Sequence, residues 1–373
     1  MKIAVLAETA SDETRVAASP TSVKAFVGKG LDVVIQAGAG DGSFFSDNDY
    51  KSAGASISKT AASSVKGADI VLSVRRPGAS AVKAMKKGAV VAAQLDPFGD
   101  RKDIDGLASA GLTAFSMELI PRITRAQSMD VLSSQANLAG YKAVIDAAEQ
   151  FSRAFPMMMT AAGTVPPAKV FVMGAGVAGL QAIATARRLG AVVSATDVRA
   201  AAGEQVASLG AKFVFVEGMK DSATQGGYAK ELSDEDKNKQ AELVANHIKG
   251  QDIVITTALI PGRPAPELVS KAMVETMASG SVIVDMAVER GGNCPLSKAG
   301  KVITHKGVTI MGYTNLPGRL SGNASSLYAK NLQNFIDLMI SDEAKLAIDW
   351  EDEIITGCAL THDGKVIHPV FNN

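Results

Sequence analysis

Residues 169–186 read KVFVMGAGVAGLQAIATA. The short apolar run at residues 169–173 predicts a buried strand, and residues 180–186 have the apolar spacing of a helix. Between them, Gly174, Gly176 and Gly179 follow the pattern GxGxxG. A strand, a glycine turn and a helix in this order are typical of a doubly wound parallel sheet. The stretch therefore predicts an α/β fold.

The glycine loop also predicts a binding site for a dinucleotide. In this motif one glycine makes the tight turn, a second lets the backbone approach a pyrophosphate, and a third lets the helix pack closely on the strand. The phosphates would lie on N–H groups at the positive end of the helix. At the end of the next predicted strand, the carboxylate of Asp197 can accept from both ribose hydroxyls. The expected nucleotide contacts are Gly174, Ala175, Gly176, Val177, Ala178, Gly179, Asp197 and Val198.

The acid indicates which nucleotide is bound. Asp197 would repel a 2′-phosphate, so the loop predicts NAD(H) rather than NADP(H), although the nearby cation Arg199 acts against that preference. The alternative is that the glycines serve packing only and Asp197 is a solvated loop residue. A second glycine-rich stretch, residues 38–42 (GAGDG), also follows a predicted strand. The residues after it, SFFSD, do not open a helix, so we expect an ordinary loop there.

Short strand-like runs alternate with helical segments over most of the chain, which predicts stacked β-α-β units. Towards the N-terminus we expect a helix at residues 21–29 and strands at residues 2–6, 32–36, 70–74 and 89–93. After the prolines at 166 and 167 we expect one doubly wound sheet, with strands at residues 169–173, 192–196, 212–216, 252–256 and 281–285.

Two long helical stripes flank the second of these sheets. Apolar residues recur at helical spacing from Leu138 to Phe151 and again from Leu327 to Met339. We expect two Rossmann-like, doubly wound parallel-sheet domains joined by these long helices, with residues 342–373 returning to the first domain. The first domain would then be discontinuous, residues 1–135 plus 326–373. The second would be residues 136–325.

Composition excludes several classes of protein. The 373 residues carry 38 Lys plus Arg against 38 Asp plus Glu, and no basic stripe is seen, so we expect no nucleic-acid partner. With 2 Cys and 4 scattered His, neither a disulfide framework nor a metal site is expected. The apolar run at the N-terminus is too short for a secretory signal, and no window has the apolar length of a membrane span. We therefore expect a cytoplasmic chain.

Two polar segments stand out. Residues 117–135 could reach into a cleft between the domains; alternatively, Thr124 and Gln127 form a capping box and Arg122 pairs with Asp130 on the surface. Residues 217–231 form a long connection that could close as a lid over a nucleotide, with Tyr228 at its tip. The alternative is a surface insertion with no role.

None of the 4 His follows a strand end of the second sheet convincingly. Oxidising an alcohol or amine usually needs such a proton-transfer group near the nicotinamide. Hydride transfer between two nicotinamides needs no general acid or base. It needs two rings held face to face with water excluded.

Five segments together resemble the NAD(H)-binding component of proton-translocating nicotinamide nucleotide transhydrogenase. The resemblance runs from Met1 to about residue 370. The segments are PRITRAQSMD (121–130), TAAGTVPPA (160–168), GGYAK (226–230), TTALIPG (256–262) and GGNC (291–294).

This resemblance implies a soluble alpha subunit that binds NAD(H) and forms a homodimer. Hydride would pass directly between NAD(H) and the NADP(H) of a separate beta subunit, coupled to proton movement through membrane-spanning subunits. The chain would lie on the cytoplasmic face of the cell membrane, held there by its complex and without a span of its own.

The resemblance also implies roles for individual residues. Arg122 and Ser133 would hold the nicotinamide carboxamide, and Asp130 would orient Arg122. Gln127 would reach toward the ribose of the partner's NADP(H). Tyr228 would close over the nucleotide, and the loop with Ala258 and Leu259 would pass near the ring.

Two other functions compete with this hypothesis. Alanine dehydrogenase, of the same superfamily, shares the glycine loop and an opening like residues 8–20 with Arg15. Its substrate site uses a Lys and a His where this chain has Arg75 and Gln94, and Glu289 stands where that enzyme has a catalytic Asp. These departures argue against amino-acid chemistry. A non-catalytic NAD(H)-sensing module would also be compatible with the fold.

Overall fold

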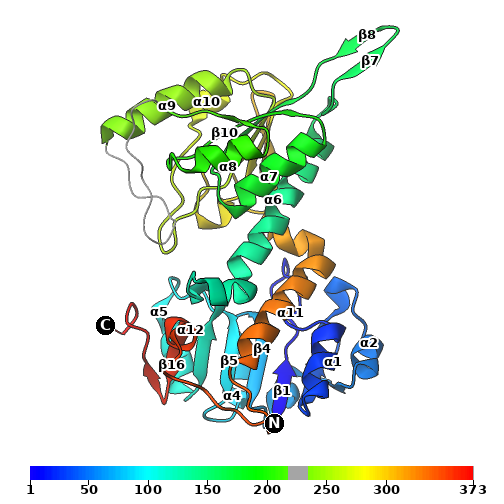
Figure 1. Ribbon diagram of the computed structural model, residues 1–373, viewed down its shortest axis with the longest axis vertical. Coiled ribbons are helices and arrows are strands. Elements are labelled where there is room, and N and C mark those ends of the chain that lie inside the picture. The colour runs from blue at the N-terminus through cyan, green and yellow to red at the C-terminus, as the bar shows by residue number, and fades with distance from the viewer. Residues whose placement is uncertain (217–233, 373) are drawn as a thin grey trace. The chain divides into compact units, whose positions relative to one another are not determined.

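The computed structural model describes residues 1–216 and 234–372 and shows two compact units (Figure 1). The first comprises Met1–Gln135 with Gly318–Asn373, and the second comprises Ala136–Pro317. The first unit is therefore discontinuous. Its second segment begins before helix α11 (Ser321–Asp337), whereas the boundary expected from sequence, between residues 325 and 326, falls inside that helix.

The first unit is built on a sheet with the strand order β17-β16-β6-β5-β4-β1-β2-β3. Strands β1 to β6 pair in parallel, and β16 from the C-terminal tail adds antiparallel to β6. The predicted return of the tail to this domain is therefore confirmed. The strands are β1 (Lys2–Val5), β2 (Asp32–Gln36), β3 (Ser56–Ser58), β4 (Ile70–Arg75), β5 (Val90–Gln94), β6 (Thr113–Ser116), β16 (Ala359–His362) and β17 (Lys365–Val366).

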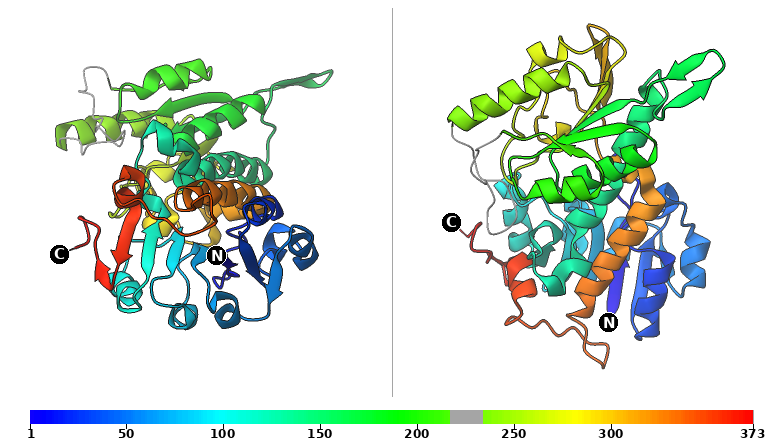
Figure 2. Two further views of the ribbon diagram at one scale, coloured as in Figure 1. Left: turned by 60° about the horizontal axis from the view of Figure 1, so that its bottom comes forward. Right: turned by 45° about the horizontal axis from the view of Figure 1, so that its top comes forward.

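Helices cover both faces of this sheet. On one face α11 packs through Tyr328, Leu332 and Phe335 against apolar strand residues, and Figure 2 shows this helix (orange) lying along the sheet. On the other face Val71 and Val91 pack against Leu107. The helices of the unit are α1 (Pro20–Gly28), α2 (Asp47–Ser52), α3 (Ala61–Val65), α4 (Ala79–Ala84), α5 (Arg101–Ser109), α11 and α12 (Glu353–Cys358).

The second unit has a sheet with the strand order β11-β10-β9-β12-β13-β15-β14. All neighbouring strands pair in parallel, except that β14 pairs antiparallel with β15. Strands β14 and β15 were not predicted from the sequence. The five predicted strands are present, although β11 ends at Phe213 rather than residue 216. The elements are β9 (Lys169–Met173), β10 (Val192–Thr196), β11 (Lys212–Phe213), β12 (Ile253–Thr256), β13 (Val282–Asp285), β14 (Lys301–His305), β15 (Val308–Gly312), α7 (Val177–Arg188), α8 (Ala202–Ser208), α9 (Asp234–Ile248) and α10 (Lys271–Val274).

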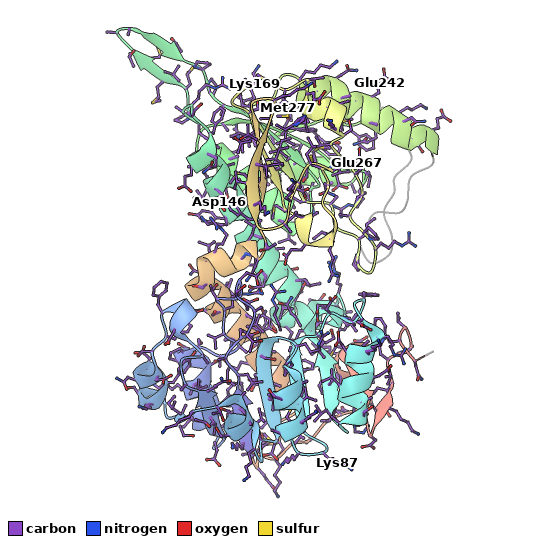
Figure 3. The ribbon with its side chains drawn as sticks, turned by 180° about the vertical axis from the view of Figure 1, so that it is seen from behind. Lys87, Asp146, Lys169, Glu242, Glu267 and Met277 are labelled. Atoms are coloured by element: carbon purple, nitrogen blue, oxygen red, sulfur yellow. The ribbon has the colours of Figure 1, made fainter. Side chains whose placement is uncertain are left out.

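The long helix α6 (Val131–Gln150) carries the first predicted apolar stripe and belongs partly to each unit. Ala143, Val144 and Ala147 are buried in the core of the second unit. Asp146, labelled in Figure 3, is also buried and pairs with Lys142 one turn earlier.

The strand orders and pairings of the two units confirm the predicted α/β class with two doubly wound parallel sheets.

A two-stranded hairpin, β7 (Met158–Thr160) and β8 (Gly163–Val165), projects from the second unit (Figure 1). Met157, Met158 and Met159 leave 60%, 44% and 80% of their surface exposed. The sequence pattern did not predict this hairpin, because the two prolines after it indicate only a break before β9.

Within the described ranges, no helix has both the length and the apolar character needed to span a membrane.

Candidate nucleotide-binding site

The glycine loop joins the end of β9 to the start of α7. Gly174 has φ +105°, a left-handed conformation that favours glycine, and its N–H donates to Thr196 O at 2.8 Å. A Cβ at Gly179 would lie 1.8 Å from Gly174 O. These two glycines are required by the tight turn and by the close packing of α7 on the loop.

Gly176 has no such internal reason to be glycine. Its φ of −80° suits any residue. Apart from its chain neighbours, no heavy atom in the described part of the chain lies within 4 Å of the place a Cβ would occupy. The residue is exposed and occupies the N-cap position of α7, where no side chain caps the helix. Bare, exposed backbone at this point is what the approach of a pyrophosphate requires.

The first turn of α7 presents its N–H groups beside Gly176. Because Gly176 has no side chain, it cannot cap these groups, and the positive end of the helix dipole favours an anion there. Helix α6 supports this turn closely, since a Cβ at Gly140 would lie 2.1 Å from Ala178 O. The position of the helix N-terminus therefore depends on a glycine well outside the loop.

The loop lies at the point where the strand order of the sheet reverses. Strand β9 has β10 on one side and β12 on the other, and ligands of such sheets bind outside the carboxyl ends of these strands. Thr257, which follows β12, donates from its backbone N to Met173 O at 2.9 Å and from Oγ1 to Gly174 O at 3.2 Å. The residues after β9 and β12 are thus brought together.

Asp197 follows β10 and is only 8% exposed. Its Oδ2 accepts from Ala175 N at 2.7 Å and from Arg199 Nη2 at 2.9 Å. Its Oδ1 accepts from Arg199 N and Arg199 Nε, each at 2.9 Å. Burial would raise the pKa of Asp197, but the hydrogen bonds from Arg199 and Ala175 outweigh it and hold the pKa below its ordinary value. The alternative that Asp197 is a solvated loop residue is therefore wrong. Val198, the next residue, is half-buried.

The loop after β12 is held by a residue to which the sequence patterns assigned no role. Buried Asn293 accepts from Ala258 N at 3.1 Å and donates from Nδ2 to Ala258 O at 2.9 Å and Pro266 O at 2.8 Å. Buried Asp285 in turn accepts from Asn293 N at 3.1 Å. This network fixes the start of the loop, while Leu259 is 49% exposed. Only the GGNC segment, which includes Asn293, pointed to this position.

The predicted nicotinamide-end residues lie in the first unit. Arg122 and Gln127 are exposed, and Gln127 belongs to the short helix η3 (Thr124–Met129). Asp130 precedes α6, and its carboxylate accepts from Ser133 N at 2.9 Å and from Ser133 Oγ at 2.6 Å. The contact of Asp130 with Arg122 stays a prediction.

The proposed capping box of Thr124 and Gln127 is wrong. The residue before η3 is Ile123, whose side chain cannot accept a hydrogen bond, and Thr124 lies inside the helix. The cap in this region is Asp130, which satisfies donors at the start of α6.

Two of the residues that would matter in an amino-acid dehydrogenase, Arg15 and the partly exposed Arg75, form an ionic cluster with buried Glu13 in the first unit. Arg15 donates from Nε and Nη2 to Glu13 at 2.7 Å and from Nη1 to Gln135 at 2.9 Å, and it is 5% exposed. Arg75, opposite Gln94 in register, also donates to Glu13. Burial would raise the pKa of Glu13, but the two arginines outweigh it and lower the pKa to about 2. Arg15 therefore serves to neutralise a buried acid.

Tyr228 and the predicted lid, residues 217–231, lie outside the described residues. In the remainder of the chain, no group of three or more His, Cys, Asp or Glu side chains is placed to hold a metal ion.

Comparison with known proteins identifies the family. Residues 4–139 match the family model of the alanine dehydrogenase/PNT N-terminal domain, and residues 143–369 match that of the C-terminal domain. An NAD(P) transhydrogenase alpha-subunit chain of Rhodospirillum rubrum is 54% identical over 379 residues, covering 100% of this chain and 99% of that protein.

A solved structure of transhydrogenase from Sinorhizobium meliloti is 58% identical, with a TM-score of 0.90, covering 98% of this chain and all of that one. Alanine dehydrogenase of Halomonas elongata is 28% identical over 99% of this chain and 95% of that protein. The chain therefore belongs to the alanine dehydrogenase/PNT family, and within it to the NAD(P) transhydrogenase alpha subunits.

Proposed function

We propose that this chain binds NAD(H) through the glycine loop and passes hydride directly between it and NADP(H) held by a partner subunit. The observation that carries the binding site is Gly176, a glycine with neither strained backbone nor a close neighbour among the described residues, at the uncapped start of α7. The preference for NAD(H) is supported by Asp197, because a carboxylate that already lies against the loop would repel a 2′-phosphate.

The nicotinamide end is proposed to contact residues of η3 and the start of α6. Arg122 and Ser133 would hold the carboxamide, and Asp130 would orient Arg122. The two hydrogen bonds that Asp130 accepts from Ser133 support a common site for Asp130 and Ser133. Gln127 would reach toward the ribose of the partner's NADP(H), and its exposure supports a role toward another molecule. Tyr228 would close over the nucleotide, and the loop at Ala258 and Leu259, fixed by Asn293, would pass near the ring.

The proposed contribution of this chain to the reaction is to position the two nicotinamide rings. When bound, the two nicotinamides supply the hydride donor and acceptor, and no proton is exchanged with a side chain. The chain's own residues would bind the pyrophosphate, hold the carboxamide and exclude water, which are the contributions that orient two rings for direct transfer.

The partners are proposed to be an NADP(H)-binding beta subunit and membrane-spanning subunits that couple transfer to proton movement. This is supported by the names of the relatives, since an alpha subunit implies other subunits; the alpha subunit of Cereibacter sphaeroides is 44% identical, and the chain covers 71% of it. The chain would be cytoplasmic and peripheral on the inner face of the membrane.

A homodimer is proposed to form through the β7–β8 hairpin. Isolated two-stranded hairpins are at best marginally stable in water, and this one carries the exposed Met157, Met158 and Met159. Replacing Met157 and Met159 by Gln should shift the sedimentation coefficient from dimer to monomer. A dimer that persists would place the interface elsewhere.

The function is tested by following hydride transfer from NADH to an NADP⁺ analogue by absorbance. The purified chain is measured alone and with a purified NADP(H)-binding transhydrogenase component, and alanine plus NAD⁺ is the control. Turnover only with the partner supports the proposal. Turnover of alanine by the chain alone would overturn it in favour of an amino-acid dehydrogenase.

The role of Gln127 has its own test. Gln127→Asn should lower transfer with the partner about tenfold or more, while the dissociation constant for NADH changes less than about twofold. An equal loss in transfer and in NADH binding would show that Gln127 acts on this chain's own nucleotide or structure.

A further inference from the structure

The guanidinium of Arg199 lies directly on the carboxylate of Asp197. Arg199 Nε donates to Oδ1 and Nη2 donates to Oδ2, both at 2.9 Å, in a two-pronged pair. Backbone donors occupy the same oxygens, with Arg199 N on Oδ1 and Ala175 N on Oδ2. Each oxygen of Asp197 therefore accepts two hydrogen bonds.

These four donors use the full acceptor capacity of the group, since an ionised carboxylate offers about four lone-pair positions. The two backbone donors are fixed, because Ala175 N belongs to the glycine loop and Arg199 N is part of the turn after β10. The two guanidinium donors sit on a rotatable side chain. A ribose diol that donates both hydroxyls to Asp197 needs the positions that the guanidinium holds.

The backbone of Arg199 is held by hydrogen bonds of its own, separate from those of the guanidinium. Ala202 N donates to Arg199 O at 3.1 Å, which anchors the residue at the start of α8. The side chain of Arg199 is 22% exposed, against 7% for that of Asp197. Rotation about the side-chain bonds alone would therefore take the guanidinium off Asp197 while the Cα of Arg199 stays in place.

We propose that Arg199 is a specificity-determining residue, whose guanidinium competes with the adenosine ribose for Asp197 and, once displaced, lies beside the ribose 2′ position. This inference rests on the proposed NAD(H) site. Arg199 then weakens NAD(H) binding, because its pair with Asp197 has to be broken. It also lessens the rejection of NADP(H), because a cation next to the 2′ position partly offsets the repulsion between Asp197 and a 2′-phosphate.

The test compares Arg199→Gln with Arg199→Lys in the full chain. Dissociation constants for NADH and NADPH are measured from nucleotide fluorescence, and thermal unfolding checks that each variant is folded. Arg199→Gln removes both the two-pronged pair and the charge. We expect it to bind NADH about three- to tenfold more tightly than wild type and NADPH more weakly, so that the ratio between them widens.

Arg199→Lys is the matched control, since it keeps the charge and removes the planar fork. We expect it to bind NADH more tightly than wild type and to retain the residual affinity for NADPH. A lysine variant with wild-type affinity for NADH would show that the two-pronged geometry is not needed, which overturns the competition of the guanidinium for both carboxylate oxygens.

Weaker NADH binding by Arg199→Gln would also overturn the inference, because the guanidinium would then be a contact of the bound nucleotide. Failure of the proposed function looks different. If the wild-type chain itself does not bind NADH, or if Asp197→Asn leaves its affinity unchanged, the ribose site is wrong and this inference falls with it.

Discussion

Two glycine-rich loops in this chain follow parallel strands, and their glycines have different reasons to be there. In residues 38–42, a Cβ at Gly40 would lie 2.4 Å from Phe45 O, and one at Gly42 would lie 2.7 Å from Thr14 O. Both of these glycines are required by the packing of the loop on its own unit. In residues 174–179, Gly176 has open space around it and an ordinary φ.

The loops also differ in the helix that starts from each, although each has a carboxylate that accepts from its backbone. Asp47 accepts from Gly38 N at 3.0 Å, much as Asp197 accepts from Ala175 N at 2.7 Å. After residue 40, however, the chain forms only the short helix η1 (Asp41–Ser43). After residue 176 it forms the 12-residue helix α7. A glycine motif thus indicates an anion site when a long helix starts in it and one glycine is unexplained by packing.

The strongest loss of binding is expected from Gly179→Ala. Its Cβ would lie 1.8 Å from Gly174 O, so the loop has to shift. We expect NADH affinity to fall about a hundredfold and the second unit to lose about 2 to 4 kcal/mol of stability. Titration with NADH and thermal unfolding measure the two effects. Gly42→Ala is the control, and it should destabilise the chain while keeping NADH affinity; a matching loss of binding would show that the other loop also contacts the nucleotide.

The next variant separates binding from stability. Gly176→Ala meets no neighbour among the described residues, so its cost to stability should be about 1 kcal/mol or less. The added methyl group would stand where a pyrophosphate approaches, and we expect NADH affinity to fall about tenfold or more. Gly40→Ala should show the reverse pattern in the same two assays. Unchanged NADH affinity in Gly176→Ala would remove the main support for the site.

A smaller change is expected from the two acids. Asp197→Asn should weaken NADH binding about tenfold and reduce the discrimination against NADPH, because the ribose acceptor loses its charge. Asp47→Asn should leave both nucleotide affinities unchanged. Fluorescence titration of the two variants with both nucleotides decides this, and equal behaviour of the pair would contradict the distinction between the loops.

A substitution of Glu8, which follows β1 in the first sheet, should leave NADH binding unchanged. Its expected effect is on the pH dependence of stability. Burial raises its pKa from 4.5 to about 7, although the N–H groups of Val74 and Arg75 act against this. The folded chain therefore holds this proton more tightly than the unfolded chain does. Stability from Glu8 is present below about pH 4.5 and is lost as the pH rises through about 7.

Denaturant unfolding followed by Trp350 fluorescence reports on this unit, because Trp350, the single tryptophan of the chain, stacks on Phe115. Glu8→Gln should flatten the pH dependence between about 4.5 and 7 by about 1 to 3 kcal/mol. An unchanged slope would show that another group titrates. The pH dependence that Asp197 contributes has the opposite sign, because its pKa is lowered in the folded chain and the resulting stability is lost as the pH falls.

Local patterns in the sequence were enough to predict the α/β class, strands β9 to β13 of the second sheet, the glycine loop and its acid. Apolar periodicity and glycine spacing act over a few residues, and Asp197 is placed by the strand it ends. The two long helical stripes likewise predicted α6 and α11, since a sustained helical period leaves little choice of element.

The partners that these elements meet were set by tertiary packing and could not be predicted in this way. The antiparallel strands β14 and β16, the support of Ala258 by Asn293, and the unit boundary before α11 depend on contacts between separate segments of the chain. The close approach of Gly140 to Ala178 was likewise not predictable from local patterns. Nor were the hydrogen bonds that Asp197 accepts from both Ala175 and Arg199. Such contacts follow from the packing of completed helices and sheets, which no local pattern encodes.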